Sequence, residues 1–297
     1  MFQMAAKLLQ QKISCGIRFS RLGAVFLVLF LSACSSTSFI YNRLDIILPW
    51  YLDDYVDLSR EQNHSLDSLL QPFLRWHRQE ELPQYALMLS DIEASLDQPV
   101  SPEVVAGIFT TIEAAWFRLE DRSIEWMFKL GDELSEEQIS QLLGVLNQEQ
   151  EEYEEKYLPR SDEEYQEESY DNFTDGLGDY LGRLSSNQRE ILLGASAELQ
   201  RIDGLWLQER AAWLGNFTRA LRREPGWKQQ LRDLKNNREQ HAAPEYSAMY
   251  AHNLTVIGRA IAEVVDSRSE KQDKRVRGKL ESLREDFEGL IAQGNAN

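Results

Sequence analysis

The chain has 297 residues, with 32 Lys and Arg against 49 Asp and Glu, which gives a formal net charge of −17 at pH 7. Apolar residues make up 42%, enough for a buried core, and this excludes a disordered chain. Two cysteines exclude a disulfide framework and a cysteine-built zinc site. The acidic balance argues against nucleic acid as a partner, because phosphates attract basic surfaces.

The N-terminus carries the signals of secretion. Residues 1–21 contain basic residues and no acidic one, and an apolar run follows at 22–31. As a helix this run is about 15 Å long, about half the hydrocarbon thickness of a bilayer. The segment is therefore too short for a transmembrane helix, and it predicts a secretory signal peptide.

The end of the apolar run reads Leu31-Ser32-Ala33-Cys34. This resembles the lipobox of bacterial lipoproteins, which is cut just before its cysteine. The resemblance implies that a peptidase recognises Leu31, Ser32 and Ala33, that residues 1–33 are removed, and that Cys34 carries acyl chains. An ordinary signal peptide with an incidental cysteine is the alternative.

The residue after the cysteine bears on sorting. In the lipoprotein family an aspartate at that position favours retention in the inner membrane, and this chain has Ser35. The resemblance therefore implies the outer membrane, with the protein on its periplasmic face. We expect 34–57 to be the lipidated N-terminus and anchor-proximal segment.

Beyond this segment the apolar residues recur at spacings of three and four, which is typical of helices that bury one face. One such stripe contains Leu192, Ala195, Leu199, Ile202, Trp206, Trp213, Phe217 and Leu221. The predicted helices are 60–80, 83–97, 102–130, 136–157, 162–182, 186–223, 225–239, 244–267 and 269–292. The fold class is all-α, a multi-helix bundle of about eight to nine helices. We expect a single domain over 58–292, with two lobes meeting near residue 160 as the alternative, and a flexible tail at 293–297.

Several helix starts are marked by capping boxes, in which a serine oxygen caps an early N–H and a later Gln or Glu reaches back. The boxes begin at Ser59, Ser135, Ser161 and Ser185. Prolines are expected at first helical positions, where the missing donor is not needed. These are Pro102, Pro225 and Pro244. Pro83 is expected to break one long helical pattern into two helices.

Three of the boxes follow a leucine and read LSREQ (58–62), LSEEQ (134–138) and LSSNQ (184–188). They resemble the LTxxQ motif of small helical periplasmic chaperones, with Ser in place of Thr. The resemblance implies a chaperone-like binder of unfolded proteins. Plain helix capping, with the leucine packed inward, is the alternative.

A third resemblance rests on four segments in order: 39–45, 50–55, 58–62 and 74–85. They read FIYNRLD, WYLDDY, LSREQ and LRWHRQEELPQY. The order resembles a family of uncharacterised helical lipoproteins of Gram-negative bacteria, catalogued as a domain of unknown function. The resemblance implies secretion, lipidation and an all-α fold, and it implies no activity.

Two polar clusters supply the candidate binding residues, which are Asp53, Asp54, Trp76, His77, Arg78 and Glu81. On a helix His77 and Glu81 are i,i+4 and share a face. A binding cleft would use His77 and Arg78 to hold an anion and Trp76 to stack on a sugar or peptide. A hydrolase would use two carboxylates, such as Asp54 and Glu81, with one kept protonated. The third hypothesis is a salt-bridged helix junction that orients the domain on its anchor.

One possible metal-binding pattern in the sequence is incomplete. Glu61 and His64 match half of a ferritin-like di-iron pair, but the second half is missing, so we expect no metal and no cofactor.

Charged residues are unevenly distributed: residues 149–171 hold 11 acidic and two basic residues, and 219–238 hold seven basic and two acidic ones. Such blocks are typical of solvated helix faces. The alternatives are that they pair with each other or dock partners of opposite charge.

The sequence as a whole predicts a lipid-anchored interaction or scaffold module on the periplasmic face of the outer membrane. Acyl chains on Cys34 would hold it to the membrane, and its partner would be an envelope protein or peptidoglycan. It would perform no chemistry. The alternatives are a chaperone-like binder of unfolded envelope proteins and a hydrolase acting on envelope glycans or peptides.

Overall fold

Helices make up nearly all of the described chain. The computed structural model describes residues 36–295, which contain eleven α-helices of ten residues or more and no strand. The elements are α3 (Ser36–Tyr41), α4 (Leu44–Asp53), α5 (Arg60–Trp76), the π-helical turn η1 (His77–Glu81), α6 (Leu82–Ser95), α7 (Pro102–Glu133), α8 (Glu136–Tyr157), α9 (Asp162–Leu181), α10 (Ser186–Glu198), α11 (Asp203–Ala220), α12 (Trp227–Asn236), α13 (Arg238–His241), α14 (Pro244–Asp266) and α15 (Glu270–Asn295). The all-α prediction is confirmed, while the predicted number of helices is too low.

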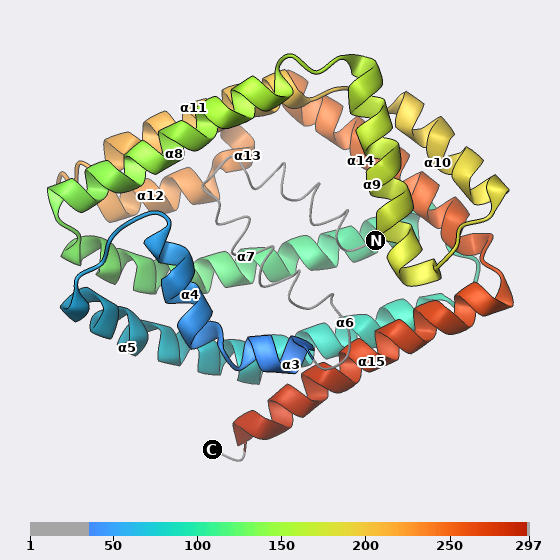
Figure 1. Ribbon diagram of the computed structural model, residues 1–297, viewed down its shortest axis with the longest axis horizontal. Coiled ribbons are helices and arrows are strands. Elements are labelled where there is room, and N and C mark those ends of the chain that lie inside the picture. The colour runs from blue at the N-terminus through green and yellow to red at the C-terminus, as the bar shows by residue number, and fades with distance from the viewer. Residues whose placement is uncertain (1–35, 296–297) are drawn as a thin grey trace.

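The long helix α7 crosses the middle of the molecule (Figure 1). In this view α5 and α6 run along one side of it, and α8 and α11 run along the other. The last helix, α15, packs along α6, so the C-terminal helix lies beside an early part of the chain. None of the helices within 36–295 is long and apolar enough to cross a membrane.

The largest apolar core joins both halves of the chain. It includes Leu89 on α6, Leu177 on α9, Ile261 on α14 and Leu290 on α15, all 2% exposed or less. A division near residue 160 would cut through this cluster. The described residues therefore form one domain, and the alternative of two lobes is wrong.

The helix starts follow the predicted chemistry. All four predicted capping boxes, at Ser59, Ser135, Ser161 and Ser185, are present with both hydrogen bonds. Pro102 and Pro244 occupy first helical positions as predicted. The prediction for Pro225 is wrong, because α12 begins two residues later, at Trp227. There Gly226 precedes the helix with a φ of 93°, a left-handed conformation that glycine adopts without strain.

The predicted helix 186–223 is two helices. α10 ends at Glu198, Leu199 has an extended backbone with a ψ of 137°, and α11 begins at Asp203. The break divides the apolar stripe of this segment among three separate clusters, so one continuous stripe in the sequence serves three parts of the core. This split and the unpredicted α3 and α4 account for most of the extra helices.

Pro83 does not separate two helices as predicted. The chain passes from α5 to α6 through η1 without leaving a helical path, and Pro83 is the second residue of α6, where its missing donor is tolerated. At the other end of the chain α15 continues through Asn295, three residues into the segment predicted as a tail.

The basic block at 219–238 pairs with α7 and the start of α8, not with the acidic block at 149–171. Its partners all lie between residues 120 and 136. The pairs are Arg223–Glu136, Lys228–Asp132, Arg232–Glu125, Lys235–Asp121 and Arg238–Glu120. The alternative in which the two blocks pair with each other is therefore wrong for the described residues.

Candidate functional site

The second polar cluster of the sequence falls on η1, the π-helical turn between α5 and α6. A π-turn places one extra residue in the helix, and such turns are frequent at functional sites. Here His77 is fully buried and Glu81 is 3% exposed, so both side chains point into the protein. The predicted shared face of these two residues is therefore an interior face.

His77 lies among aromatic rings. Its Nδ1 is 2.9 Å from the hydroxyl oxygen of Tyr41, the last residue of α3. The ring centres of Phe73 and Tyr85 lie 6.4 and 5.6 Å from the centre of the imidazole. Burial lowers the pKa of His77 to about 3, and the nearby charge of Arg78 lowers it further in the same direction. The imidazole is therefore neutral at neutral pH. It joins α3 to η1 and does not present a positive charge to an anion.

Glu81 is held by Arg118 of α7 in a two-point ion pair. Arg118 Nε and a terminal nitrogen lie 2.8 and 2.9 Å from the two carboxylate oxygens. Glu81 is buried, whereas the Arg118 side chain is 44% exposed. Burial raises the pKa of the neighbouring Tyr85, and the charge of Glu81 raises it further. Glu81 thus connects η1 to the central helix, with both oxygens engaged.

Arg78 connects η1 to the N-terminal segment on the outside of the same turn. It donates to Asn42 Oδ1 at 2.6 Å, and its guanidinium lies 5.1 Å from the centre of the Tyr41 ring. Asn42 in turn donates to Gln293 near the end of α15 at 3.0 Å. Three segments far apart in sequence meet at this arginine.

We call this set of residues the junction. It consists of Tyr41, Asn42, His77, Arg78, Glu81 and Arg118. Together they fasten α3 and the residue after it to η1, α7 and α15, within the segment 34–57 that is predicted to be anchor-proximal.

The remaining sequence candidates lie outside the junction. Trp76 is half-buried, donates to Glu80 at 3.1 Å and has the guanidinium of Arg122 5.6 Å from its ring. Asp53 and Asp54 are exposed at the far end of α4. That helix separates them from Tyr41 by about 15 Å of its length. The structure therefore does not bring Asp54 and Glu81 together as a hydrolase pair.

The neighbouring tyrosines point into the protein. Tyr51 and Tyr55 contact each other through their hydroxyl groups at 3.2 Å, and Tyr55 donates to Glu149 Oε1 at 3.0 Å. Glu149 is 4% exposed and pairs at 3.4 Å with Arg210, which is equally buried. Sequence reasoning missed this buried ion pair because Glu149 opens the acidic block and looked like a solvated residue.

The S-x-x-Q boxes pair with one another, which sequence reasoning also missed. Gln62 and Gln138 exchange two amide hydrogen bonds of 2.9 and 2.7 Å. Each amide also donates to the backbone ahead of the other helix, at Glu133 and Asp57. The boxes thus cap their own helices and also hold α5 and α8 together at their N-termini.

A second pair repeats this arrangement. Gln188 and Gln272 exchange hydrogen bonds of 3.2 and 2.9 Å, and Gln272 belongs to a fourth box that begins at Ser269. Gln188 is fully buried and Gln272 is 7% exposed. The fourth S-x-x-Q was present in the sequence, but Arg268 stands where the other three boxes have leucine.

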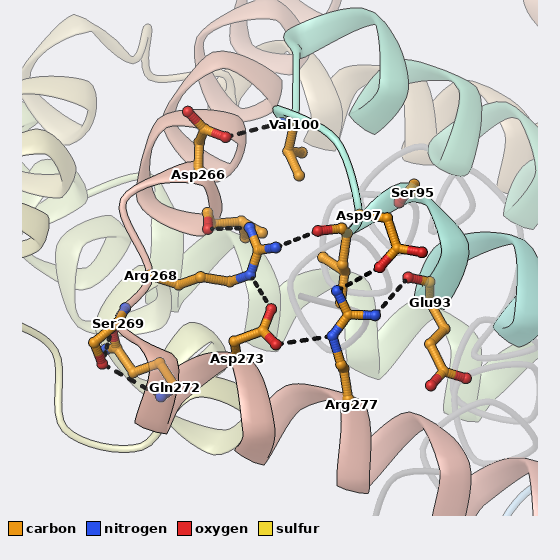
Figure 2. Close-up of polar contacts among 12 residues, drawn as sticks. Glu93, Ser95, Asp97, Val100, Asp266, Arg268, Ser269, Gln272, Asp273 and Arg277 are labelled. Atoms are coloured by element: carbon orange, nitrogen blue, oxygen red, sulfur yellow. Dashed lines mark hydrogen bonds and ion pairs between the residues drawn. The ribbon is translucent and has the colours of Figure 1, made fainter.

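The start of α15 is also fastened to the end of α6 (Figure 2). Asp273 accepts from Arg268 at 2.7 Å and from Arg277 at 2.8 Å. Burial works against the charge of Asp273, but these hydrogen bonds outweigh it and lower its pKa. Arg277 also pairs with Asp97 at 2.9 Å. α15 is therefore held at both ends, here at α6 and at the junction near its C-terminus.

The lipobox, Leu31 to Cys34, lies outside the described residues. A family model described as "Family of unknown function (DUF6279)" matches residues 54–247, more than half of the chain. The match includes the segments 58–62 and 74–85, and it begins after α4. No curated protein and no solved structure matches the chain.

Proposed function

The chain belongs to this family of unknown function, and from its own contacts we propose that it is a lipid-anchored scaffold of the bacterial envelope. In this proposal Cys34 carries acyl chains in the outer membrane, on the periplasmic face. The helical body binds a protein or peptidoglycan partner and performs no chemistry.

The observation that carries the proposal is the junction. α3 begins two residues after Cys34, and within six residues Tyr41 is 5% exposed and in contact with His77. Arg78 and Asn42 extend the contact to α15. A flexible tether would allow the body to rotate about its anchor, whereas a docked α3 gives the body a fixed orientation to the membrane. This is the role that a scaffold needs.

The hydrolase alternative fits these residues less well. A general acid must reach a substrate, and the carboxylate of Glu81 is buried with both oxygens held by Arg118. Its proposed partner Asp54 is exposed, beyond the far end of α4. The same contacts that weaken this alternative strengthen the structural role of the junction.

The chaperone alternative needs a continuous apolar surface for unfolded clients. Outside α3 and α4, the large exposed apolar side chains of the described residues are Leu87, Leu158 and Leu193, which lie on or beside three different helices. The paired glutamines give the S-x-x-Q boxes a structural use as well. We therefore place this alternative second.

Two measurements on the full-length protein in its bacterial host test the proposal. Incorporation of a palmitate analogue, lost in Cys34→Ser, is the expected result for the anchor. In-cell crosslinking and mass spectrometry should capture one dominant envelope partner with the wild type. Arg78→Met should lose that partner, while Arg259→Met, which removes an exposed arginine on α14, should keep it.

Each measurement has a result that contradicts the proposal. Absence of the palmitate label excludes the lipid anchor. A broad spread of unfolded envelope proteins among the crosslinks favours the chaperone instead. Loss of activity on envelope glycans in Glu81→Gln, with the fold intact by circular dichroism, would favour the hydrolase.

A further inference from the structure

Helix α4 carries large apolar side chains on both its buried and its outer side. Leu44 and Leu48 are buried against the body, at 1% and 3% exposure. Ile46 and Trp50 point outward, at 56% and 68% exposure, and they are i,i+4 neighbours on one face. Asp45 and Asp53 are exposed near the two ends of this helix, and the outward side chains between them are apolar. A surface helix ordinarily has a polar outer face, so the exposed Ile46 and Trp50 indicate that something covers this part of it.

The end of α3 continues this outer surface. Phe39 is 65% exposed, and the guanidinium of Arg43 lies 5.7 Å from the centre of its ring. Arg43 precedes Ile46 by three positions. Three of the six large exposed apolar side chains in the described residues therefore lie within twelve positions, next to one another along α3 and α4. We call Phe39, Ile46 and Trp50 the outer face.

The position of the outer face in the chain points to its occupant. Phe39 follows Cys34 by five positions. Even a fully extended chain covers only about 3.5 Å per residue, which is about 18 Å over this interval. Acyl chains on Cys34 would therefore hold the outer face close to the lipid surface. Tryptophan favours that zone because its ring is apolar and its N–H is polar.

We propose that the outer face docks on the lipid bilayer that holds the anchor, with the side chains of Phe39, Ile46 and Trp50 at the level of the headgroups. This inference rests on the proposed lipid anchor. α4 is about 15 Å long and cannot span a bilayer, so it lies along the surface, as interfacial helices do. The junction then transmits this orientation to the body.

The test uses the full-length lipidated protein in vesicles of phosphatidylethanolamine and phosphatidylglycerol. Two variants, Ile46→Cys and Trp50→Cys, each carry an environment-sensitive fluorophore on the introduced cysteine. Lipids that bear a nitroxide on the upper part of the acyl chain act as the quencher. Leu87→Cys and Leu193→Cys are matched controls, since both leucines are highly exposed elsewhere. Flotation of the vesicles shows separately whether the protein is anchored.

We expect strong quenching at positions 46 and 50 and little at 87 and 193. In the Ile46→Cys protein, adding Phe39→Ser and Trp50→Ser should lower the quenching toward the control level. The matched pair Leu87→Ser and Leu158→Ser should leave it unchanged.

Two results would overturn the inference while leaving the anchor intact. In one, the protein floats with the vesicles but positions 46 and 50 are quenched no more than the controls. In the other, two Ile46→Cys chains crosslink to each other, which assigns the outer face to a second copy of the chain. Protein that fails to float with the vesicles contradicts the proposed function itself, and this inference fails with it.

Discussion

The junction and the contact between α7 and α12 both join distant segments through charged groups, but in opposite surroundings. At the junction one carboxylate, Glu81, is buried and held at two points by Arg118. Between α7 and α12 several pairs lie at the surface, and in the pair Arg232–Glu125 the side chains are 36% and 60% exposed. The junction has one such ion pair among the described residues, yet its buried carboxylate has less access to water than the exposed pairs do.

The difference shows that burial, not the number of ion pairs, decides what each contact contributes. Opening an exposed ion pair costs little free energy, because water then solvates both ions. A buried carboxylate that loses its partner is not solvated by water in this way, so the loss costs more free energy. The α7–α12 pairs therefore align two helices, whereas the junction contacts decide whether α3 and η1 keep their places.

The largest effect is expected from Arg118→Met. It leaves the buried Glu81 carboxylate without its ion pair, and the free energy of unfolding should fall by about 3 kcal/mol. Urea denaturation followed by circular dichroism measures this loss. Glu81→Gln/Arg118→Met removes both charges and should recover most of it. A loss below about 1 kcal/mol in Arg118→Met would place this pair with the surface pairs.

The glutamine pairs fall between the two extremes. Gln188→Ala removes a fully buried amide and leaves Gln272 without its partner, so we expect a loss of about 2 kcal/mol. Gln62→Ala opens the half-buried pair, where water replaces the lost bonds, and should cost about 1 kcal/mol. Thermal or urea unfolding of the two variants compares them, and equal losses would contradict the burial argument.

The junction should also make stability depend on pH. His77 has a folded pKa of about 3, below its ordinary value of 6.5, so the unfolded chain binds a proton first. Its contribution is present above pH 6.5 and is lost as the pH falls toward 3. Tyr41 and Tyr85 face it and are uncharged in this range, the charge of Arg78 acts in the same direction as burial, and Glu81 on the same interior face is paired with Arg118.

For one proton the slope in this window is about 1.4 kcal/mol per pH unit. Urea denaturation between pH 7 and pH 4 measures it, with His77→Gln as the comparison. We expect the variant to have the shallower slope. Identical slopes would mean that His77 is accessible to water and not buried as described.

The smallest effect is expected from Arg232→Ala. Its pair with Glu125 is exposed, so the free energy of unfolding should change by less than about 1 kcal/mol. High salt should reduce even this difference, because it screens exposed charges. A loss as large as that of Arg118→Met would remove the contrast between the two regions.

Much of the fold could be predicted from local chemistry. The capping boxes at Ser59, Ser135, Ser161 and Ser185 are local signals, and they placed four helix starts correctly. The break at Leu199 was missed because the apolar stripe continues through it, although its residues pack in separate clusters. A stripe shows that residues are buried and does not show which cluster buries them.

The candidate site was harder to predict because its contacts join distant segments. The sequence placed His77 and Glu81 on one face, but nothing local indicated that Tyr41 and Arg118 would meet them. The buried pair of Glu149 and Arg210 is 61 positions apart and lies partly in an acidic run. For the same reason the glutamine boxes could be recognised one at a time but not paired.

The most direct test of the central claim is hydrogen–deuterium exchange of residues 36–53 in the full-length protein. If the junction fastens α3 and α4 to the body, these residues should exchange slowly in the wild type and faster in Tyr41→Phe/Arg78→Met, with α11 unchanged in both. Equal exchange of 36–53 in the two proteins would contradict this claim, because α3 and α4 would then keep their places without the junction.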